Sequence, residues 1–151
     1  MPQVEQSIEI QAPPAAVFAL IADQPERVPE WWPSFELQQR VTPAPTAIGS
    51  VSRYVYNMMG IRIKGETQVL QMDGQSRLVV KTISGIDSMY DYRFAPLDGG
   101  GTLLTVRVAY ALPGSVLGQL LNRHTMEQKY EHDLERGLQT LKALIEAEAQ
   151  P

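Results

Sequence analysis

The chain contains no cysteine, so it can form no disulfide bond, no thiolate metal site and no cysteine nucleophile. Its two histidines, His124 and His132, form neither a Glu-x-x-His nor a His-x-x-x-His pattern. The sequence also has no Gly-x-Ser-x-Gly elbow and no phosphate-binding loop. From these absences we expect no metal site, no cofactor, no nucleophilic hydrolysis and no nucleotide binding.

Long apolar runs and basic stripes are missing as well. No apolar run approaches the roughly 18 residues of a transmembrane helix, and the N-terminus does not open with a basic segment and an apolar core. We therefore expect a cytoplasmic protein with no integral membrane segment. The formal charge of −4 and the scattered Lys and Arg side chains argue against a nucleic-acid partner, because such surfaces need a basic stripe.

The longest helical pattern covers 116–147 and follows a Leu-Pro-Gly-Ser stop signal. At about 100° per residue, its apolar side chains form one stripe. The stripe consists of Val116, Leu120, Leu134, Leu138, Leu141 and Ile145. Arg123 and Glu127 interrupt it, with Tyr130 beside them and His124 at its edge. Either this half of the helix is solvated and carries an exposed i,i+4 ion pair, or it roofs a cavity while the other half packs on a sheet.

Ahead of this helix, alternation with a period of two predicts seven strands. Their expected ranges are 3–11, 35–42, 50–58, 61–72, 77–84, 88–96 and 102–111. A short helix is expected at 15–22, and the proline-rich stretch 23–33 leaves room for one more helical turn. Short connections force neighbouring strands into antiparallel hairpins. The sequence thus predicts an α+β fold in a single domain spanning 1–151, a length that can bury roughly two-thirds of its unfolded surface.

Tyrosines dominate the face of the strands that should be covered. Charged residues alternate with them and must face water, which turns the tyrosines inward. Five tyrosines lie on this face and the sixth lies on the long helix: Tyr54, Tyr56, Tyr90, Tyr92, Tyr110 and Tyr130. Each buried phenol needs a hydrogen-bond partner, whereas Phe, which occurs three times, does not. We predict a wettable cavity between the sheet and the first half of the helix, lined by these tyrosines with Arg123, His124 and Glu127.

The adjacent tryptophans Trp31 and Trp32 admit two interpretations. They could form an aromatic binding shelf on the surface, or they could pack beneath a loop. Packing is the commoner use of such side chains, and we favour it here. Exposed indoles would instead favour a module that binds a protein partner through this corner.

The order of strand, two short helices, six antiparallel strands and one long helix resembles the helix-grip fold of the START and polyketide cyclase/dehydratase superfamily, which includes relatives of the birch pollen allergen. The stretches that carry the resemblance are 12–23, 25–33, Ile48-Gly49 and 138–142. It covers nearly the whole chain and implies a curved sheet that grips the long helix around a hydrophobic cavity. It also implies ligands such as lipids, sterols, quinones and polyketides, but it supplies no family-wide catalytic motif.

Three functions follow as hypotheses. The first is binding or transport of a small hydrophobic or amphipathic molecule, whose polar end the tyrosines, Arg123 and Glu127 would fix. The second is a polyketide cyclase- or dehydratase-type enzyme, in which a tyrosine or Glu127 handles a proton and Arg123 steadies an enolate. The third is a partner-binding module that acts through the two tryptophans or an exposed sheet edge. A homodimer is left open by the sequence.

Overall fold

The computed structural model describes residues 2–111 and 123–149, with Arg123 described by its backbone alone. Seven strands form one antiparallel sheet in the order β1-β7-β6-β5-β4-β3-β2. They are β1 (Gln3–Ile10), β2 (Phe35–Arg40), β3 (Val51–Met58), β4 (Ile61–Asp73), β5 (Arg77–Thr82), β6 (Ser88–Pro96) and β7 (Thr102–Tyr110). Strands β2 to β7 pair in chain order as hairpins, and β1 adds to β7. The predicted antiparallel sheet is confirmed.

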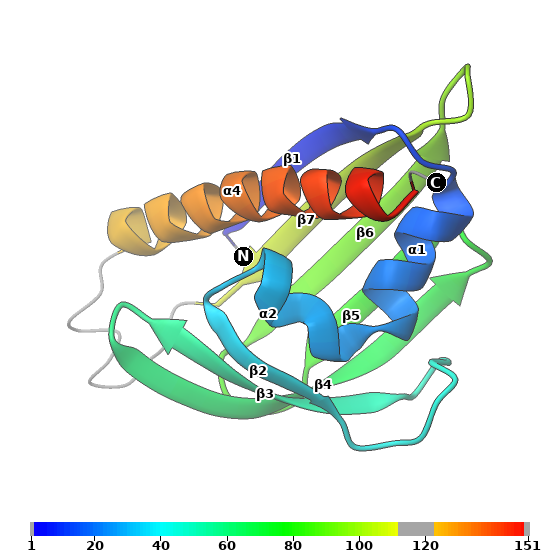
Figure 1. The fold of residues 1–151 in the computed structure, drawn as a ribbon. Helices are drawn as coiled ribbons and strands as arrows, with labels where there is room; N and C mark the ends of the chain where they lie inside the picture. Colours follow the sequence, from blue (N-terminus) through cyan, green and yellow to red (C-terminus); the bar gives the residue numbers. More distant parts are fainter. Residues whose placement is uncertain (1, 112–122, 150–151) are drawn as a thin grey trace.

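The described helices lie on one side of this curved sheet (Figure 1). Those described are α1 (Pro14–Asp23), the 3-10 turn η1 (Pro25–Arg27), α2 (Val28–Trp31) and α4 (Arg123–Ala149). The long helix α4 packs beside β1, whereas α1 lies against β6 and α2 against β2. The two short helices between the first two strands therefore cover a part of the sheet that α4 does not. No helix in the described part of the chain is long and apolar enough to span a membrane.

Two strands end earlier than their patterns predict because side-chain hydroxyls replace ladder hydrogen bonds. Strand β2 ends at Arg40, and Thr42 Oγ1 then accepts the N–H of Val51 at 2.9 Å. Strand β5 ends at Thr82, whose Oγ1 accepts the N–H of Ser88 at 2.8 Å. Such side-chain to backbone bonds compete with the sheet and close the turns that follow.

Bulges bend the sheet and change which residues face inward. The register shifts between Phe35 and Leu37 in β2 and between Val69 and Gln71 in β4. A bulge inserts one extra residue, so the side chains beyond it change faces and the strand curves. As a result Leu37 is 40% exposed, while the polar Gln38 and Arg40 are half-buried. Strand β2 therefore carries polar side chains where apolar ones would be expected.

The C-terminal part of the α4 stripe is buried as predicted. Every apolar residue predicted there is at most 3% exposed: Leu134, Leu138, Leu141 and Ile145. Towards the start of the helix the buried line continues through Tyr130 and Met126, which are both fully buried. Four residues advance about 40° beyond one turn, so the buried face drifts around the helix and Met126 fills the predicted interruption. The predicted stripe residues Val116 and Leu120 lie outside the described residues.

Trp31 and Trp32 are packed in the core, with exposed fractions of 0% and 1%. The ring of Trp32 meets Phe35 and Tyr90 edge to face, each at a centroid distance of 5.6 Å. Helix α4 also approaches this corner closely, since a Cβ on Gly137 would lie 3.0 Å from the carbonyl oxygen of Trp31. The packing interpretation of the two tryptophans is confirmed, and a surface shelf built from them is ruled out.

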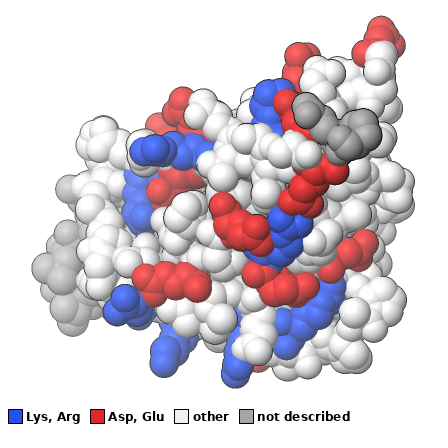
Figure 2. Space-filling model, viewed as in Figure 1, with Lys and Arg blue, Asp and Glu red and all other residues white. Residues whose placement is uncertain are grey.

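Ion pairs link the short helices to the end of α4. Arg27 in η1 donates to Glu30 of α2 at 2.8 Å and to Glu148 of α4 at 2.6 Å. Acidic and basic side chains are interspersed over this face of the molecule (Figure 2). Nearer the start of α4, Lys129 donates to Asp133 of the same helix at 3.0 Å and to Ser34, which lies between α2 and β2, at 3.1 Å. These contacts fix the short helices and the long helix as one layer.

Candidate functional site

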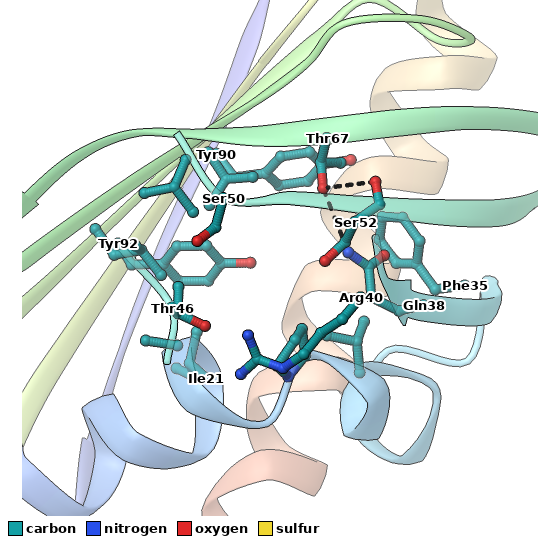
Figure 3. Close-up of a pocket in the computed structure, with 16 residues that line it drawn as sticks. Ile21, Phe35, Gln38, Arg40, Thr46, Ser50, Ser52, Thr67, Tyr90 and Tyr92 are labelled. Atoms are coloured by element: carbon teal, nitrogen blue, oxygen red, sulfur yellow. Dashed lines mark hydrogen bonds between the residues drawn. The ribbon is translucent and has the colours of Figure 1, made fainter. Parts of the chain in front are cut away.

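A pocket opens between the α1–η1–α2 segment and the inner face of strands β2 to β6 (Figure 3). Its empty space, including a mouth that is open to solvent, is about 660 Å³. Its lining consists of Ile21, Ala22, Pro25, Val28, Phe35, Gln38, Arg40, Thr46, Ser50, Ser52, Thr67, Val69, Leu78, Val80, Tyr90 and Tyr92. Small-molecule sites are mostly apolar, with a few polar groups that orient the ligand. The lining of this pocket has that character.

The apolar wall of the pocket comes from facing layers. Ile21 and Val28 project from the short helices, while Val69, Leu78 and Val80 project from the centre of the sheet. Alternation along the strands places these side chains on the inner face, and the bulge after Val69 keeps it there while Leu70 turns outward. The two layers thus present apolar surface to each other across the pocket.

The polar side of the pocket is built from the last residue of β2 and the loop that follows it. Figure 3 shows the guanidinium of Arg40 and the hydroxyls of Thr46 and Tyr92 turned towards the same part of the pocket. Gln38 donates to Thr67 Oγ1 at 3.4 Å, so this amide is already engaged. The hydroxyl of Thr46 is buried and has no hydrogen-bond partner among the described residues.

Arg40 is the one charged side chain among the described residues that line the pocket. Its Nη2 donates to the carbonyl oxygen of Asp23, the last residue of α1, at 2.7 Å. Its Nε lies 3.6 Å from Glu26 Oε2, which is too long for a hydrogen bond. The side chain is 19% exposed, whereas that of Glu26 is 53% exposed. Arg40 therefore caps the C-terminus of α1 and places a partly buried cation at the pocket.

Tyr90 and Tyr92 line the pocket as hydrogen-bond donors. Burial in an apolar environment raises the pKa of both phenols above its ordinary value. Both therefore stay protonated at neutral pH. Together with Arg40 they give the pocket a set of donors without a carboxylate, imidazole or amine among its described lining residues.

The other predicted tyrosines lie elsewhere. Tyr54 donates to Ser84 O at 2.8 Å and accepts from the N–H of Ile86 at 3.0 Å. Tyr56 donates to Asp133 Oδ2 at 3.3 Å, and burial raises its pKa. Its ring, Tyr130 and Tyr110 form a stacked column beneath α4, with centroid distances of 6.2 and 4.4 Å. Burial also raises the pKa of Tyr130.

Of the predicted polar residues of α4, His124 and Glu127 do not line this pocket. Glu127 is half-buried and His124 is exposed, while the side chain of Arg123 lies outside the described residues. The described pocket lies under α1 and α2 because α4 runs along β1 and leaves β2 to β6 to the shorter helices. A ligand role for Arg123, His124 and Glu127 stays a prediction. Within the described part of the chain no group of three His, Cys, Asp or Glu could hold a metal ion.

Arg40, Thr46 and Ser50 are pocket residues that were not predicted from the sequence. One feature of β2 points to Arg40: polar side chains of this strand lie on the same inward face as the buried Phe35. A strand whose inward positions are polar suggests that it borders a cavity rather than a dry core. The bulge hides this signal, since it breaks the simple alternation that the sequence pattern assumes.

Comparison with solved structures identifies the fold. The protein TTHA0849 from Thermus thermophilus is 24% identical over 99% of this chain and 100% of its own, with a TM-score of 0.81. The Zhui aromatase/cyclase from Streptomyces sp. R1128 is 15% identical over 99% and 96%, with a TM-score of 0.82. A START superfamily protein from Mycobacterium smegmatis is 17% identical over 96% and 97%, with a TM-score of 0.77. At these identities the likeness shows the fold, and the predicted helix-grip fold is confirmed.

Comparison with sequence families is more specific. No curated protein matches the chain. A family model does match residues 1–146, nearly the whole chain, and it is described as polyketide cyclase/dehydrase and lipid transport. This agrees with the resemblance in the proline-rich N-terminal stretches and the long helix. The chain therefore belongs to the polyketide cyclase/dehydrase and lipid transport family.

Proposed function

We propose that this protein binds a small amphipathic molecule in the pocket between α1–α2 and the sheet. The observation that carries the proposal is the division of the lining into an apolar wall and a cluster of hydrogen-bond donors. Burial of apolar ligand surface against Val69, Leu78 and Val80 would supply about 25 cal/mol per Å². The donors at Arg40 and Tyr92 would orient the ligand. Family membership supports the proposal at the level of lipid-like or polyketide-like ligands.

Filling the pocket tests this proposal. Val80 lies on the inner face of β5, so Val80→Phe should occupy part of the space that the ligand needs. We expect this variant to weaken binding of the neutral apolar dye N-phenyl-1-naphthylamine by about tenfold or more, since the larger ring takes up space that the dye would fill. The matched control is Val55→Phe, which lies in β3 between the inward-facing Tyr54 and Tyr56 and does not line the pocket.

The measurement is dye fluorescence, with circular dichroism as a check that both variants fold. Loss of binding in Val80→Phe alone would support the pocket as the binding site. Unchanged dye binding in Val80→Phe would place any ligand elsewhere, and an equal loss in the control would show a general effect on folding.

A cyclase- or dehydratase-type reaction is the alternative that the family name raises. Such a reaction needs a group that exchanges a proton near neutral pH. Tyr90 and Tyr92 are poor acids because burial raises their pKa, and the described lining offers no carboxylate or imidazole. Binding is therefore the better-supported function. Conversion of a linear poly-ketone, lost in Tyr92→Phe while dye binding is retained, would reverse this order.

A further inference from the structure

We propose that the ligand of this pocket is an amphipathic monocarboxylate whose carboxylate binds beside Arg40. This inference rests on the proposed binding function and assigns the chemical class of its ligand. It starts from the unused hydrogen-bonding capacity of the guanidinium, which carries five N–H donors. One hydrogen bond to Asp23 O is the only one that joins this guanidinium to the described residues. Donors remain for a ligand at the pocket.

The existing counter-ion of Arg40 can be displaced. Glu26 approaches Nε at 3.6 Å, beyond hydrogen-bond distance, and its side chain is 53% exposed. Exposed ion pairs of this kind contribute little because water screens them. A carboxylate that enters from the pocket could approach the guanidinium at hydrogen-bond distance in a drier environment, where charge-assisted bonds are stronger. A ligand carboxylate would therefore displace Glu26 from Arg40.

A second group points to an acceptor at the same place. The hydroxyl of Thr46 is buried without a partner among the described residues, and buried polar groups rarely lack one. It faces the same part of the pocket as the guanidinium and the hydroxyl of Tyr92 (Figure 3). Donors that converge from β2, from the loop after it and from β6 match a group that only accepts, as an ionised carboxylate does.

The charge of the pocket limits the charge of the ligand. Arg40 is the single charged side chain of the described lining, and Glu26 partly offsets it from outside. One negative charge can be matched here, whereas a phosphate monoester carries about −1.5 to −2 at neutral pH. The apolar wall of Val69, Leu78 and Val80 would then receive a hydrocarbon tail or ring. These features favour a carboxylate over a phosphate.

The test compares three ligands with the same tail by isothermal titration of the full chain: decanoate, decan-1-ol and decyl phosphate, each below its aggregation concentration. We expect decanoate to bind at least about tenfold more tightly than decanol, as a charge-assisted hydrogen bond would give. Arg40→Gln should abolish this preference, and Arg40→Lys should retain part of it because the charge stays. Glu26→Gln should strengthen decanoate binding several-fold without changing decanol binding.

The control is Arg53→Gln, because Arg53 is exposed on β3, pairs with Gln39 and does not line the pocket. It should leave all three affinities unchanged. Equal binding of decanoate and decanol by the natural sequence, or tighter binding of decyl phosphate, would overturn the inference while leaving the proposed binding function intact. An equal loss of both ligands in Arg40→Gln and Arg40→Lys, with no gain in Glu26→Gln, would assign Arg40 a purely structural role. Binding of none of the ligands, together with no dye binding, would reject the proposed function itself.

Discussion

At the scale of single residues, Tyr54 shows how a buried phenol can serve the fold rather than a ligand. Its hydroxyl bridges Ser84 O and the N–H of Ile86 across the turn between β5 and β6. The bridge requires glycine at Gly65 and Gly85, where an added Cβ would clash with the Tyr54 hydroxyl. Gly85 also has a φ of +85°, which other residues adopt with strain. Tyr54 therefore ties two hairpins together.

Removing this hydroxyl should reduce stability without affecting the pocket. Tyr54→Phe leaves the buried N–H of Ile86 without its acceptor, and we expect it to lower the free energy of unfolding by about 1–3 kcal/mol in urea titrations. The matched control is Tyr92→Phe, since no hydrogen bond joins the Tyr92 hydroxyl to a described residue and its change should cost less than about 1 kcal/mol. Equal losses in the two variants would contradict the assignment of Tyr54 as a structural tie.

The sequence predicts that the six tyrosines point into the protein, but it does not predict the role of each one. Alternation places a side chain on one face and is a local property. The partners that decide a role come from far along the chain, as Ser84 does for Tyr54 and Asp133 does for Tyr56. Only Tyr90 and Tyr92 line the described pocket. A wettable inner face therefore stays a prediction, because the residues that would carry the wettability depend on tertiary contacts.

At the scale of secondary-structure elements, a charged cluster joins β5 to β6 on the outer face of the sheet. Arg77 stands directly opposite Arg93 in the register, an arrangement that is unfavourable for like charges. Asp91 offsets the repulsion between the two arginines, because its carboxylate accepts hydrogen bonds from Arg77 at 3.1 and 3.0 Å and from Arg93 at 3.5 Å. Burial acts to raise the pKa of Asp91, but the two arginines outweigh it and hold that pKa below its ordinary value.

This cluster predicts an acid-sensitive contribution to stability. A carboxyl whose pKa is lower in the folded state stabilises the protein above its unfolded pKa of about 3.9, and the contribution is lost as the pH falls through the folded pKa. Asp91→Asn should therefore lower the free energy of unfolding by about 1 kcal/mol at pH 7, and by less at about pH 2.5. Urea titrations at both pH values measure it, with Asp98→Asn in the exposed β6–β7 turn as the control. A loss that is equal at both pH values would refute the electrostatic explanation.

The elements were predicted well, whereas the pocket beneath α1 and α2 was not predicted, for one physical reason. Strand alternation, turn glycines and the α4 stripe are local sequence patterns. The seven strands could therefore be placed within two residues of their observed ends. The position of the pocket depends instead on the bulges in β2 and β4 and on which strands each helix covers. Periodicity carries no information about either. The pocket residue Arg40 was therefore missed, although the strand that bears it was predicted.

At the scale of the whole molecule, the pocket lies between the sheet and the layer of short helices, and different interactions hold these two layers in place. The sheet is continuous from β1 to β2, whereas the short helices are held to it by packing and by contacts such as Arg40 to Asp23 O. A ligand that touches Ile21 and Val28 on one side and Val69 and Val80 on the other would join these layers. Opening of the short helices would then release the ligand and would become less favourable when the ligand is bound.

Amide hydrogen exchange should show this coupling and locate the ligand independently of mutagenesis. With N-phenyl-1-naphthylamine at about 100 times its dissociation constant, any opening that releases the dye should become up to about 100-fold rarer. We therefore expect slower exchange in α1 and β2, which line the pocket, and little change in β1, which does not. Adding the dye at the same concentration to Val80→Phe should reduce this protection by about tenfold or more, because that variant binds the dye more weakly by the same factor. Protection concentrated in α4 and β1 would instead place the ligand beneath the long helix, near Glu127, and would support the cavity position that the sequence predicts.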